Sequence, residues 1–546
     1  MTGADAIIKC LEAEEVKVVF GYPGVAIAPF YNSILDSKIR PVLVRTEQSA
    51  AHAASGYARI SGKSAVCAVT SGPGATNVIT GIATAYADSI PLICITGQVH
   101  SELIGSDVFQ EADITGAVES FVKYSYLIKN AEDIPRIFKE AFFIANSGRK
   151  GPVLIDIPVD IQDAQIKDFT YPDEISMRTY KPTVKGHAVQ IKKVISQLEK
   201  AKRPMICVGG GIHLSGGTKE LIHFAERYRI PVVSTMMGIG AMPTRHPLYF
   251  GMVGNNGKNY ANRAMNESDM LIMVGARVAD RAMSQPDLIM ANKILVHIDV
   301  DTAEIGKNVG PAIPLVGDAK HIFDQLEEEE CPAQSDALIK KRAEWIKTLE
   351  DYRDTMKRIR TPNPDYVDPA VFIRRLSEKM ENNAIYVADV GQNQIWSCTY
   401  YVVREGRFLT TGGMGTMGYS IPAAMGAKAA APNRQVVAVC GDGSFQMSMM
   451  ELATIRQHDI PVKIIVLKNN YLGLVREFQH YSYNDKYSVV DLTGSPDLSQ
   501  IAKAYEMDFI RLTNMAEAEG AIDSFLLEDK SVLMECLIDP MDMVRG

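Results

Sequence analysis

The stretch from residue 436 to 470 constrains the fold of this chain more than any other. A Val-rich apolar run ends at the sequence GDG (441–443), a helix-like segment follows, and a second apolar run (462–467) ends just before Asn469. A strand, helix and strand of this length place the two strands side by side and parallel in one sheet. Asp442 and Asn469 are therefore expected at the same edge, where open α/β sheets bind their ligands.

That edge carries the chemistry of a metal and phosphate site. One carboxylate and one amide oxygen, with backbone carbonyls nearby, form the oxygen-rich site that Mg²⁺ prefers, and phosphate oxygens complete its octahedron. Gly443 and Ser444 open the following helix, where free N–H groups and the helix dipole favour a diphosphate. A lone GDG is more often only a tight turn. The asparagine at the end of the next strand makes the metal and diphosphate interpretation the stronger one.

Composition limits the classes of protein that remain. A chain of 546 residues is too long to fold around a single hydrophobic core, and its 47% hydrophobic content suits a large globular protein of several domains. The net charge of -8 and the lack of a basic cluster interleaved with aromatics argue against nucleic acid as a partner. Eight scattered cysteines without a CxxC pair indicate buried free thiols in a reducing compartment. We expect no membrane span and no signal peptide, and hence the cytoplasm.

Alternating strand and helix patterns predict an α/β protein of three doubly wound parallel-sheet domains, at 1–165, 185–335 and 365–546. A proline-rich linker is expected at 168–186 and a polar bridging helix at 337–360. In the first domain we expect strands at 18–20, 41–44, 65–69, 91–96 and 153–157, and helices at 26–37, 49–62 and 75–87. In the second we expect strands at 205–208, 231–234, 270–274 and 294–298.

Two further features have both a structural and a functional interpretation. Glu47 follows a short strand and opens a helix rich in small residues. A carboxylate at a helix N-terminus interacts favourably with the helix dipole, and this structural role alone would explain the residue. Gly209, Gly210 and Gly211 end a strand and either make a sharp turn or allow a cofactor to approach the backbone. The sequence there lacks a complete GxGxxG, so it carries no dinucleotide fingerprint.

Taken together, motifs along the whole chain resemble the acetohydroxyacid synthase (acetolactate synthase) large subunit, within the thiamine diphosphate-dependent enzymes. The matching stretches are GYPG (21–24), RTEQSAAHAASGYAR (45–59), TSGPGATN (70–77), ITGQV (95–99), GSDVFQEAD (105–113), GPVLIDIPVDIQ (151–162), YKPTVKGH (180–187), HIDVDTAEIGKN (297–308), DVGQNQIW (389–396), GGMGTMGYSIPAA (412–424), GDGSF (441–445) and ELATIR (451–456).

The resemblance implies a pyrimidine-binding, a central and a diphosphate-binding domain, in this order. Thiamine diphosphate would lie between the first domain of one subunit and the third of another, so the protein would be at least a homodimer. Mg²⁺ would be held by Asp442, Asn469 and the backbone carbonyl of Tyr471. Met417 would support the bent cofactor. The other implied cofactor contacts are Tyr22, Pro23, Gly24, Pro73, Asn77, Val390, Gly391, Gln392, Asn393, Gly415, Gly441, Gly443 and Ser444.

The resemblance also implies a reaction and the residues that perform it. Glu47 would bond N1′ of the aminopyrimidine and promote loss of the thiazolium C2 proton. Gln110 and Phe109 would face the reacting carbonyl, and Arg281 would bind the carboxylate of the second substrate by a bidentate contact. Pyruvate would be decarboxylated and its two-carbon unit joined to pyruvate or 2-oxobutyrate, in branched-chain amino acid biosynthesis.

Biosynthetic members of the family also carry FAD in the central domain, with a structural role, and some pair with a small regulatory subunit. The residues in matching segments, for which FAD contacts are expected, are Gly209, Gly210, Gly211, Gly275, Arg277, Asp299 and Asp318.

Two positions depart from the family pattern near the substrate. Val25 replaces a usual glycine and adds bulk near the donor, and Phe478 stands where the family uses a tryptophan that favours 2-oxobutyrate. Discrimination by one extra methylene is worth only about 1–3 kcal/mol. Two alternatives therefore stay open: a thiamine diphosphate-dependent decarboxylase or carboligase for another 2-keto acid, and a paralogue that binds the cofactor without catalysis.

Overall fold

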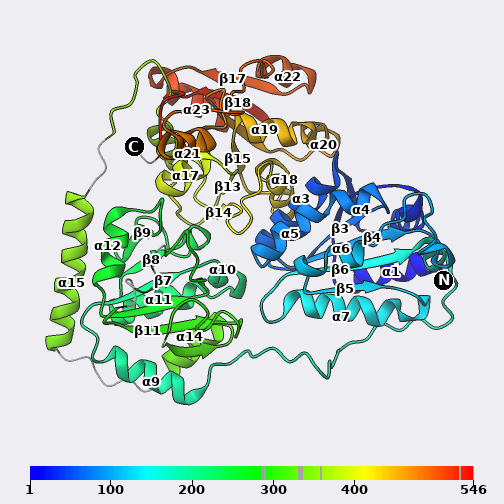
Figure 1. The fold of residues 1–546 in the computed structure, drawn as a ribbon, viewed down its shortest axis with the longest axis horizontal. Coiled ribbons are helices and arrows are strands. Elements are labelled where there is room, and N and C mark those ends of the chain that lie inside the picture. The colour runs from blue at the N-terminus through cyan, green and yellow to red at the C-terminus, as the bar shows by residue number, and fades with distance from the viewer. Residues whose placement is uncertain are drawn as a thin grey trace.

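Three six-stranded parallel sheets, each with helices packed around it, make up the chain (Figure 1). The computed structural model describes residues 1–283, 285, 287, 291–310, 312–329, 336–356, 360–527 and 530–544. The predicted α/β class with three parallel sheets is confirmed. In Figure 1 the first sheet lies on the right, the second at lower left and the third at the top, and a long linker runs from the first to the second.

The first sheet has the strand order β2-β1-β3-β4-β6-β5. Its strands are β1 (Val18–Tyr22), β2 (Arg40–Leu43), β3 (Ala65–Val69), β4 (Leu92–Gln98), β5 (Tyr124–Leu127) and β6 (Pro152–Pro158). Its helices are α1 (Gly3–Ala13), η1 (Val25–Ile27), α2 (Ala28–Ser33), η2 (Ile34–Asp36), α3 (Glu47–Ser61), α4 (Pro73–Asn77), α5 (Ile79–Ala87), η3 (Ser101–Leu103), α6 (Ile114–Ala117), η4 (Glu119–Phe121), η5 (Ala131–Asp133), α7 (Ile134–Asn146) and α8 (Val159–Asp163).

The second sheet has the order β9-β8-β7-β10-β11-β12, so the chain reverses direction between the neighbouring strands β7 and β10. Its strands are β7 (Pro204–Val208), β8 (Val232–Ser234), β9 (Tyr249–Met252), β10 (Met270–Val274), β11 (Ile294–Asp299) and β12 (Ile313–Val316). The described helices are α9 (Ala188–Leu198), α10 (Gly211–Ser215), α11 (Thr218–Tyr228), η6 (Met236–Gly238), α12 (Asn259–Glu267) and α14 (Ala319–Glu328).

The third sheet, β14-β13-β15-β16-β18-β17, repeats the topology of the first. Its strands are β13 (Ile385–Ala388), β14 (Arg407–Leu409), β15 (Val436–Gly441), β16 (Lys463–Lys468), β17 (Asp508–Leu512) and β18 (Val532–Leu537). Its helices are α16 (Pro369–Lys379), α17 (Gln392–Tyr400), α18 (Ser420–Ala430), α19 (Asp442–Ser448), η7 (Met449–Glu451), α20 (Leu452–Gln457), α21 (Gly473–Tyr483), α22 (Leu498–Ala504), η8 (Met515–Glu517) and α23 (Ala518–Leu527). On these three sheets we base our inference of domains at 1–165, 185–335 and 365–546.

The polar bridging helix, α15 (Asp336–Thr355), lies against the second sheet's helices. Its Arg342 is fully buried and donates to the carbonyls of Tyr228 (2.6 Å) and Leu198 (2.5 Å), at the ends of α11 and α9. A cation is favourable there because helix C-termini carry unpaired carbonyls and partial negative charge. Cys331 and the domain boundary expected beside it lie outside the described residues. The seven described cysteines are buried and form no disulfide bond with one another.

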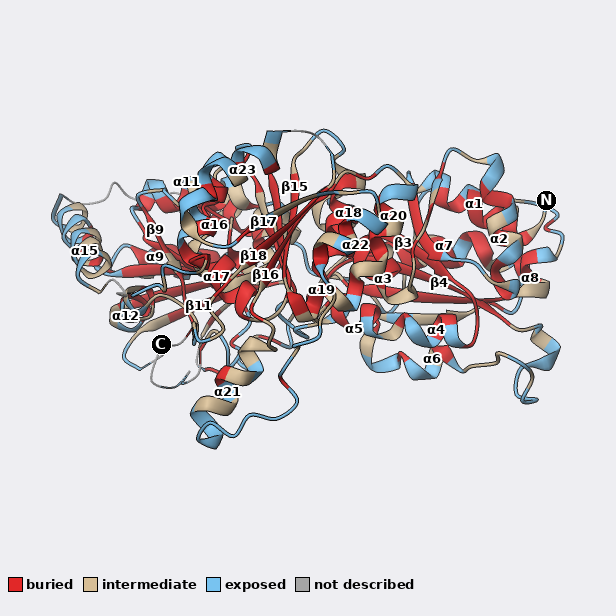
Figure 2. Cartoon of the chain, turned by 90° about the horizontal axis from the view of Figure 1, so that it is seen from above, coloured by how far each residue is buried: buried red, intermediate tan, exposed pale blue. Residues whose placement is uncertain are grey.

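No helix among the described residues has the length and apolar character that crossing a bilayer requires. Burial follows the sheets instead: their central strands are almost entirely buried, whereas the edge strands β2, β5 and β17 are largely only part-buried or exposed. Exposure concentrates on the outer helices and on α21 (Figure 2).

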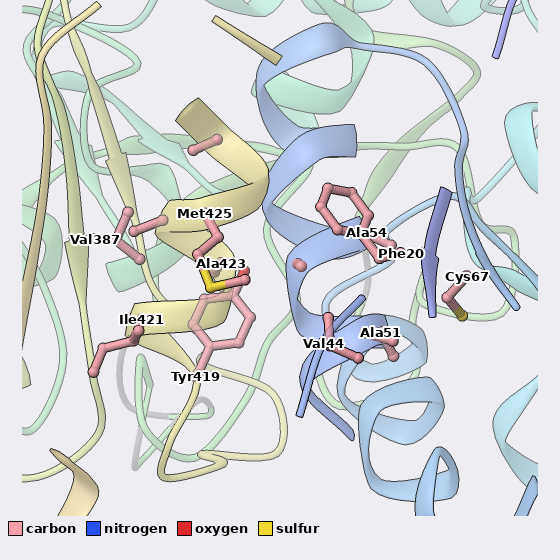
Figure 3. Packing of buried hydrophobic residues seen from close by; sticks show 14 of the residues in the cluster. Phe20, Val44, Ala51, Ala54, Cys67, Val387, Tyr419, Ile421, Ala423 and Met425 are labelled. Carbon is pink, nitrogen blue, oxygen red and sulfur yellow. The ribbon is translucent and has the colours of Figure 1, made fainter. Parts of the chain in front are cut away.

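The first and third domains share one continuous core, which forms where α3 packs against α18 (Figure 3). The two helices approach so closely that a Cβ on Gly56 would lie 1.9 Å from the Ala423 carbonyl oxygen. A Cβ on Gly426 would lie 1.7 Å from the carbonyl oxygen of Ala53. Each helix thus places a glycine against the backbone of the other, which only a residue without a side chain permits.

We predict that Gly56→Ala and Gly426→Ala each destabilise the protein, because a methyl group there must separate the two helices. Overpacking of this kind costs roughly 1–3 kcal/mol or more. Urea denaturation followed by circular dichroism should show an earlier transition for both variants. In the control Gly520→Ala the added methyl group, on α23, meets no atom within 4 Å, so that variant should be unchanged or slightly more stable. A wild-type transition in Gly56→Ala would contradict the backbone contact.

Candidate active site

A cleft that is open to solvent lies at the carboxyl edge of the third sheet, and the space in and above it amounts to about 450 Å³. Eleven of its lining residues are those predicted from the sequence to bind cofactor or metal: Val390, Gly391, Gln392, Asn393, Met417, Gly441, Asp442, Gly443, Ser444, Asn469 and Tyr471. The remainder of the lining was not predicted: Trp396, Leu467, Leu472, Gly473, Leu474, Val475 and Ile538. Gly415 does not line the cleft in the part of the chain that the structure describes.

Asp442 and Asn469 follow neighbouring strands, because β15 and β16 pair in parallel with Gly441 opposite Leu467. Both side chains are almost fully buried. Asp442 accepts the N–H groups of Asn470 at 2.7 Å and Gly443 at 3.2 Å. Burial raises the pKa of Asp442 to about 6, against the opposing effect of these bonds. A cation close to this carboxylate would stabilise its charged form.

The described residues contain no group of three or more His, Cys, Asp or Glu side chains that could hold a metal ion. A divalent ion at Asp442 therefore needs ligands of other kinds. The amide oxygen of Asn469, a backbone carbonyl and oxygens of a bound phosphate are ligands of that type, and Mg²⁺ accepts such a mixed set.

The amide of Gln392 joins three segments around the cleft. Its Oε1 accepts from Asn469 Nδ2 at 3.1 Å, and its Nε2 donates to Glu477 Oε2 and to the Asp542 carbonyl, each at 3.1 Å. Glu477, on α21, is itself buried. No local pattern marks this glutamate, because no other residue of α21 is buried.

Asp389 is a second buried carboxylate that the sequence analysis did not single out. It is fully buried and accepts the N–H groups of Val390 (2.8 Å), Gly418 (3.0 Å) and Ser420 (2.7 Å). Burial raises its pKa above the ordinary range for a carboxyl group. These bonds hold the loop after β13 against the loop that carries Met417, so one side chain orders two walls of the cleft. Its place directly after β13, two residues before Gly391, could have indicated this role.

A second group of predicted residues lies at the carboxyl edge of the first sheet. Glu47 is the first residue of α3, is half-buried, and accepts from Asn77 Nδ2 at 3.1 Å. Pro73 begins α4, which carries that asparagine. A Cβ on Gly74 would lie 3.4 Å from Glu47 Oε1, so the glycine leaves space beside the carboxylate.

The loop that carries Gln110 approaches the same edge. Gln110 has a left-handed backbone (φ 63°), and its Cα lies 2.9 Å from where a Cβ on Gly72 would be. Tyr22 ends β1, and Pro23, Gly24 and Val25 follow directly along this edge.

The predicted substrate-facing side chains are exposed and do not line the cleft. Phe109 is 86% exposed, Val25 84% and Phe478 51%. The Arg281 guanidinium is also exposed and lies 3.7 Å from the carboxylate of Asp280. Within the described residues, a single chain therefore brings together the predicted diphosphate and metal contacts, and separately those around Glu47. It does not bring both groups into one pocket.

In the second sheet, the predicted glycines lie at the point where the strand order reverses. Gly209 and Gly211 follow β7 and pack against the loop after β10. A Cβ on Gly209 would lie 2.3 Å from the Gly275 carbonyl oxygen, and a Cβ on Gly211 would lie 2.7 Å from Gly275 Cα. Arg277 donates to the Ala87 carbonyl at 3.0 Å. Asp318 caps α14 by accepting from Lys320 N–H, and burial raises the pKa of Asp299 to about 6. The three atoms nearest to a Cβ on Gly210 would all belong to Met237.

A buried carboxylate also supports the Gln110 loop. Asp156, on β6, accepts from Thr96 Oγ1 at 2.7 Å and from Gln98 Nε2 at 3.0 Å. The same Gln98 Nε2 donates to the Ala112 carbonyl at 2.8 Å, two residues beyond Gln110. Burial raises the pKa of Asp156 to about 7.

Comparison with known proteins identifies the class to which this fold and this site belong. Three models of the thiamine pyrophosphate enzymes match the chain in order: the N-terminal TPP binding domain at 1–117, the central domain at 191–326 and the C-terminal TPP binding domain at 389–536. Each match covers most of one of the three sheets.

Full-length relatives define the family more narrowly. The probable acetolactate synthase large subunit of Methanocaldococcus jannaschii is 43% identical over 99% of this chain and 93% of its own length. The acetolactate synthase large subunit of Haemophilus influenzae is 40% identical, and isozyme 3 of Escherichia coli 38%, each over 100% of this chain and 96% of the relative. The chain belongs to the acetolactate synthase large-subunit family of thiamine diphosphate-dependent enzymes. The resemblance inferred from the motifs is confirmed.

We predict that Asp156 makes the stability of the protein depend on pH. Its folded-state pKa of about 7 lies above that of an unfolded aspartate, about 4. Its contribution to stability is therefore fully present below pH 4 and is lost as the pH rises to 7. In urea denaturation, the unfolding free energy of wild type should fall relative to that of Asp156→Asn as the pH rises across this range. The exposed variant Asp173→Asn serves as control, and a pH-independent difference for Asp156→Asn would contradict the prediction.

Proposed function

We propose that this chain decarboxylates pyruvate and joins the two-carbon unit to a second 2-keto acid, pyruvate or 2-oxobutyrate, in branched-chain amino acid biosynthesis. The observation that carries the proposal is that Asp442 and Asn469 follow two paired strands at one sheet edge, in a chain that also has Glu47 at the equivalent edge of the first sheet. The names of the full-length relatives support the same reaction.

The cleft fits thiamine diphosphate with Mg²⁺. Asp442 and Asn469 supply oxygen ligands, and the backbone carbonyl of Tyr471 adds a third of the same kind. A Cβ on Gly443 would come within 2.7 Å of Leu472 and 3.5 Å of Met417, so the glycine keeps this wall of the cleft open. Gln392, Gly443 and Ser444 would hold the diphosphate. When bound, the cofactor supplies the acidic C2 carbon and the electron sink that decarboxylation of a 2-keto acid requires.

We propose that Glu47 acts on the cofactor of a second copy of the chain. Its carboxylate is bonded by Asn77 and faces the space beside Gly74, and it is not among the cleft-lining residues of its own chain. Val25, Phe109 and Phe478 are exposed in the single chain, which leaves them free to contact a second copy. Glu47 would hold and release a proton at N1′ of the aminopyrimidine.

Substrate contacts follow from the same arrangement. Gln110 and Phe109 would face the reacting carbonyl, and Arg281 would bind the carboxylate of the acceptor. Phe478 and Val25 would shape the acceptor and donor pockets. Because Phe478 lies on a helix that projects from the third domain (Figure 2), its contact with the acceptor would also form only on assembly.

We further propose that the central domain binds FAD in a structural role. The second sheet has the strand order of dinucleotide-binding folds, with Gly209–Gly211 and Gly275 at its reversal point, where such ligands bind. Gly210, Arg277, Asp299 and Asp318 lie around this point. The relatives are named large subunits, and on that ground we propose a small regulatory subunit as partner.

The reaction is tested by incubating the protein with pyruvate, Mg²⁺ and thiamine diphosphate and measuring acetoin after acid treatment. We expect acetolactate with wild type. Glu47→Gln should lower kcat by roughly 10²–10⁴-fold, the usual contribution of a positioned acid or base. Asp442→Ala should lose Mg²⁺-dependent cofactor binding. Glu102→Gln, an exposed change in the same domain, should keep full activity.

Other outcomes of this experiment separate the alternatives. A preference for a donor other than pyruvate would favour a decarboxylase or carboligase for another 2-keto acid. Cofactor binding with no exchange of the C2 proton would favour a non-catalytic paralogue. No product under any cofactor condition would overturn the proposal.

The flavin is tested by the absorbance spectrum of the purified protein and by titration with FAD. We expect a flavin band in wild type and its loss in Gly210→Val, whose side chain would enter the crevice beside Met237. Gly310→Val adds a side chain in open space and should retain the band. A wild-type protein that neither contains nor binds FAD would contradict this part of the proposal.

A further inference from the structure

One buried glutamate of the third domain reaches the start of the helix that carries Glu47. Glu451 is fully buried in η7, directly before α20. Its carboxylate accepts the N–H of Arg45 at 2.9 Å and the N–H of Thr46 at 3.2 Å. These are the two residues that immediately precede Glu47. A side chain about four hundred positions away in the sequence thus holds the backbone on which the predicted proton-transfer residue is built.

The surroundings of this carboxylate consist of hydrogen-bond donors. Thr454 Oγ1 donates to it at 2.7 Å, and the Ser49 hydroxyl also bonds to it. Together with the two backbone N–H groups these donors oppose the burial of the charge, which still raises the pKa of Glu451 above its ordinary value. The carboxylate lies at the N-terminal end of α3, where the helix dipole favours negative charge. Each of its two oxygens has a donor within hydrogen-bond distance.

The backbone that Glu451 holds lies just beyond the pairing of the first sheet. The Val44 N–H still donates to the Gly21 carbonyl of β1 at 3.2 Å, and the N–H groups of Arg45 and Thr46 follow this bond and precede the first turn of α3. The Thr46 side chain caps the helix by accepting from Ser49 N–H. The third domain makes further contacts with this connection: Arg45 donates to Gln457, and the Leu43 N–H donates to His458 Nε2 at 2.9 Å.

The segment that carries Glu451 also carries the predicted metal ligand. α19 begins at Asp442, and η7 and α20 continue from it without a break to Gln457. One continuous stretch of chain therefore lines the cleft at its start and holds the amino end of α3 further along. The side chain of Glu47 is oriented by Asn77, whereas its backbone is fixed by Glu451.

We propose that Glu451 is a positioning residue for Glu47, which sets the place of the catalytic carboxylate from the third domain of the same chain. The inference rests on the proposed function, since it assigns a task to Glu47. Displacement of a reacting group by about 1 Å can lower a rate about 10²-fold, and loss of a partner that orients a functional residue commonly costs about 10–100-fold.

The test uses the full-length protein with thiamine diphosphate and Mg²⁺ and compares wild type, Glu451→Gln, Glu451→Ala and Ser55→Ala. Glutamine keeps the size of the side chain and one oxygen that can still accept from both Arg45 and Thr46, whereas alanine removes both acceptor oxygens. Ser55 is the matched control, because it lies on α3 and bonds Tyr419 of the third domain at 3.1 Å, two turns beyond Glu47. The measurements are cofactor affinity, the exchange rate of the C2 proton of bound cofactor, kcat and KM, and the thermal midpoint.

We expect Glu451→Ala to bind cofactor within about threefold of wild type and to exchange the C2 proton at least about tenfold more slowly. Its kcat should fall in parallel while KM stays unchanged. Glu451→Gln should show the same pattern with a smaller fall, because one oxygen can still accept from the backbone. Ser55→Ala should keep the wild-type exchange rate even where its thermal midpoint falls, because its lost bond lies away from the start of α3.

Each contrary result has a definite meaning. Exchange by Glu451→Ala at the wild-type rate would overturn the positioning role. An equal loss of exchange rate in Ser55→Ala, at an equal loss of stability, would also overturn it. Loss of cofactor binding in Glu451→Ala would overturn it too, since the residue would then serve the fold of the cleft. A wild-type protein that neither exchanges the C2 proton nor forms acetolactate would instead overturn the proposed function.

Discussion

The backbone contact between α3 and α18 is the interaction on which the placement of both groups of site residues depends. Gly56 and Gly426 let the two helices meet without intervening side chains, so neither helix can shift or rotate without a clash. α3 begins with Glu47, and α18 begins directly after the loop that carries Met417. The contact therefore fixes the first domain relative to the third at the ends of the helices that carry the predicted chemistry.

Buried carboxylates hold the loops that extend from this rigid centre. Asp389 binds two loops of the cleft, Asp156 supports the Gln110 loop through Gln98, and Glu451 binds the connection before α3. In each case the acid accepts backbone or amide N–H groups that no sheet or helix satisfies. Leaving such groups unpaired in a protein interior costs about 1–3 kcal/mol each. A carboxylate with several donors thus gives a loop one defined conformation where secondary structure cannot.

The sequence predicted the class of fold and the residues of the cleft because both depend on local patterns. Strand-to-helix alternation places ligand-binding residues at the ends of strands, and Asp442 and Asn469 follow strands in that way. It did not predict the edge strand β5, and the helix expected at 75–87 is split at Val78 into α4 and α5. The roles of Asp389, Glu451 and Glu477 depend on contacts between segments far apart in the chain, which no local pattern encodes.

The difference in burial between the two parts of the site has a consequence for how specificity arises. Asp442, Asn469 and Gln392 are buried within one chain and held by bonds that exist before any ligand arrives. Val25, Phe109 and Phe478 are exposed, so little within the described part of one chain restrains their rotamers beyond an edge-to-face contact of Phe478 with Tyr483. Preorganised groups bind with little loss of conformational entropy, whereas exposed side chains must be ordered by what covers them. Under the proposed function, the cofactor site is a property of the folded chain, while the choice between 2-keto acids depends on the interface that orders these exposed residues.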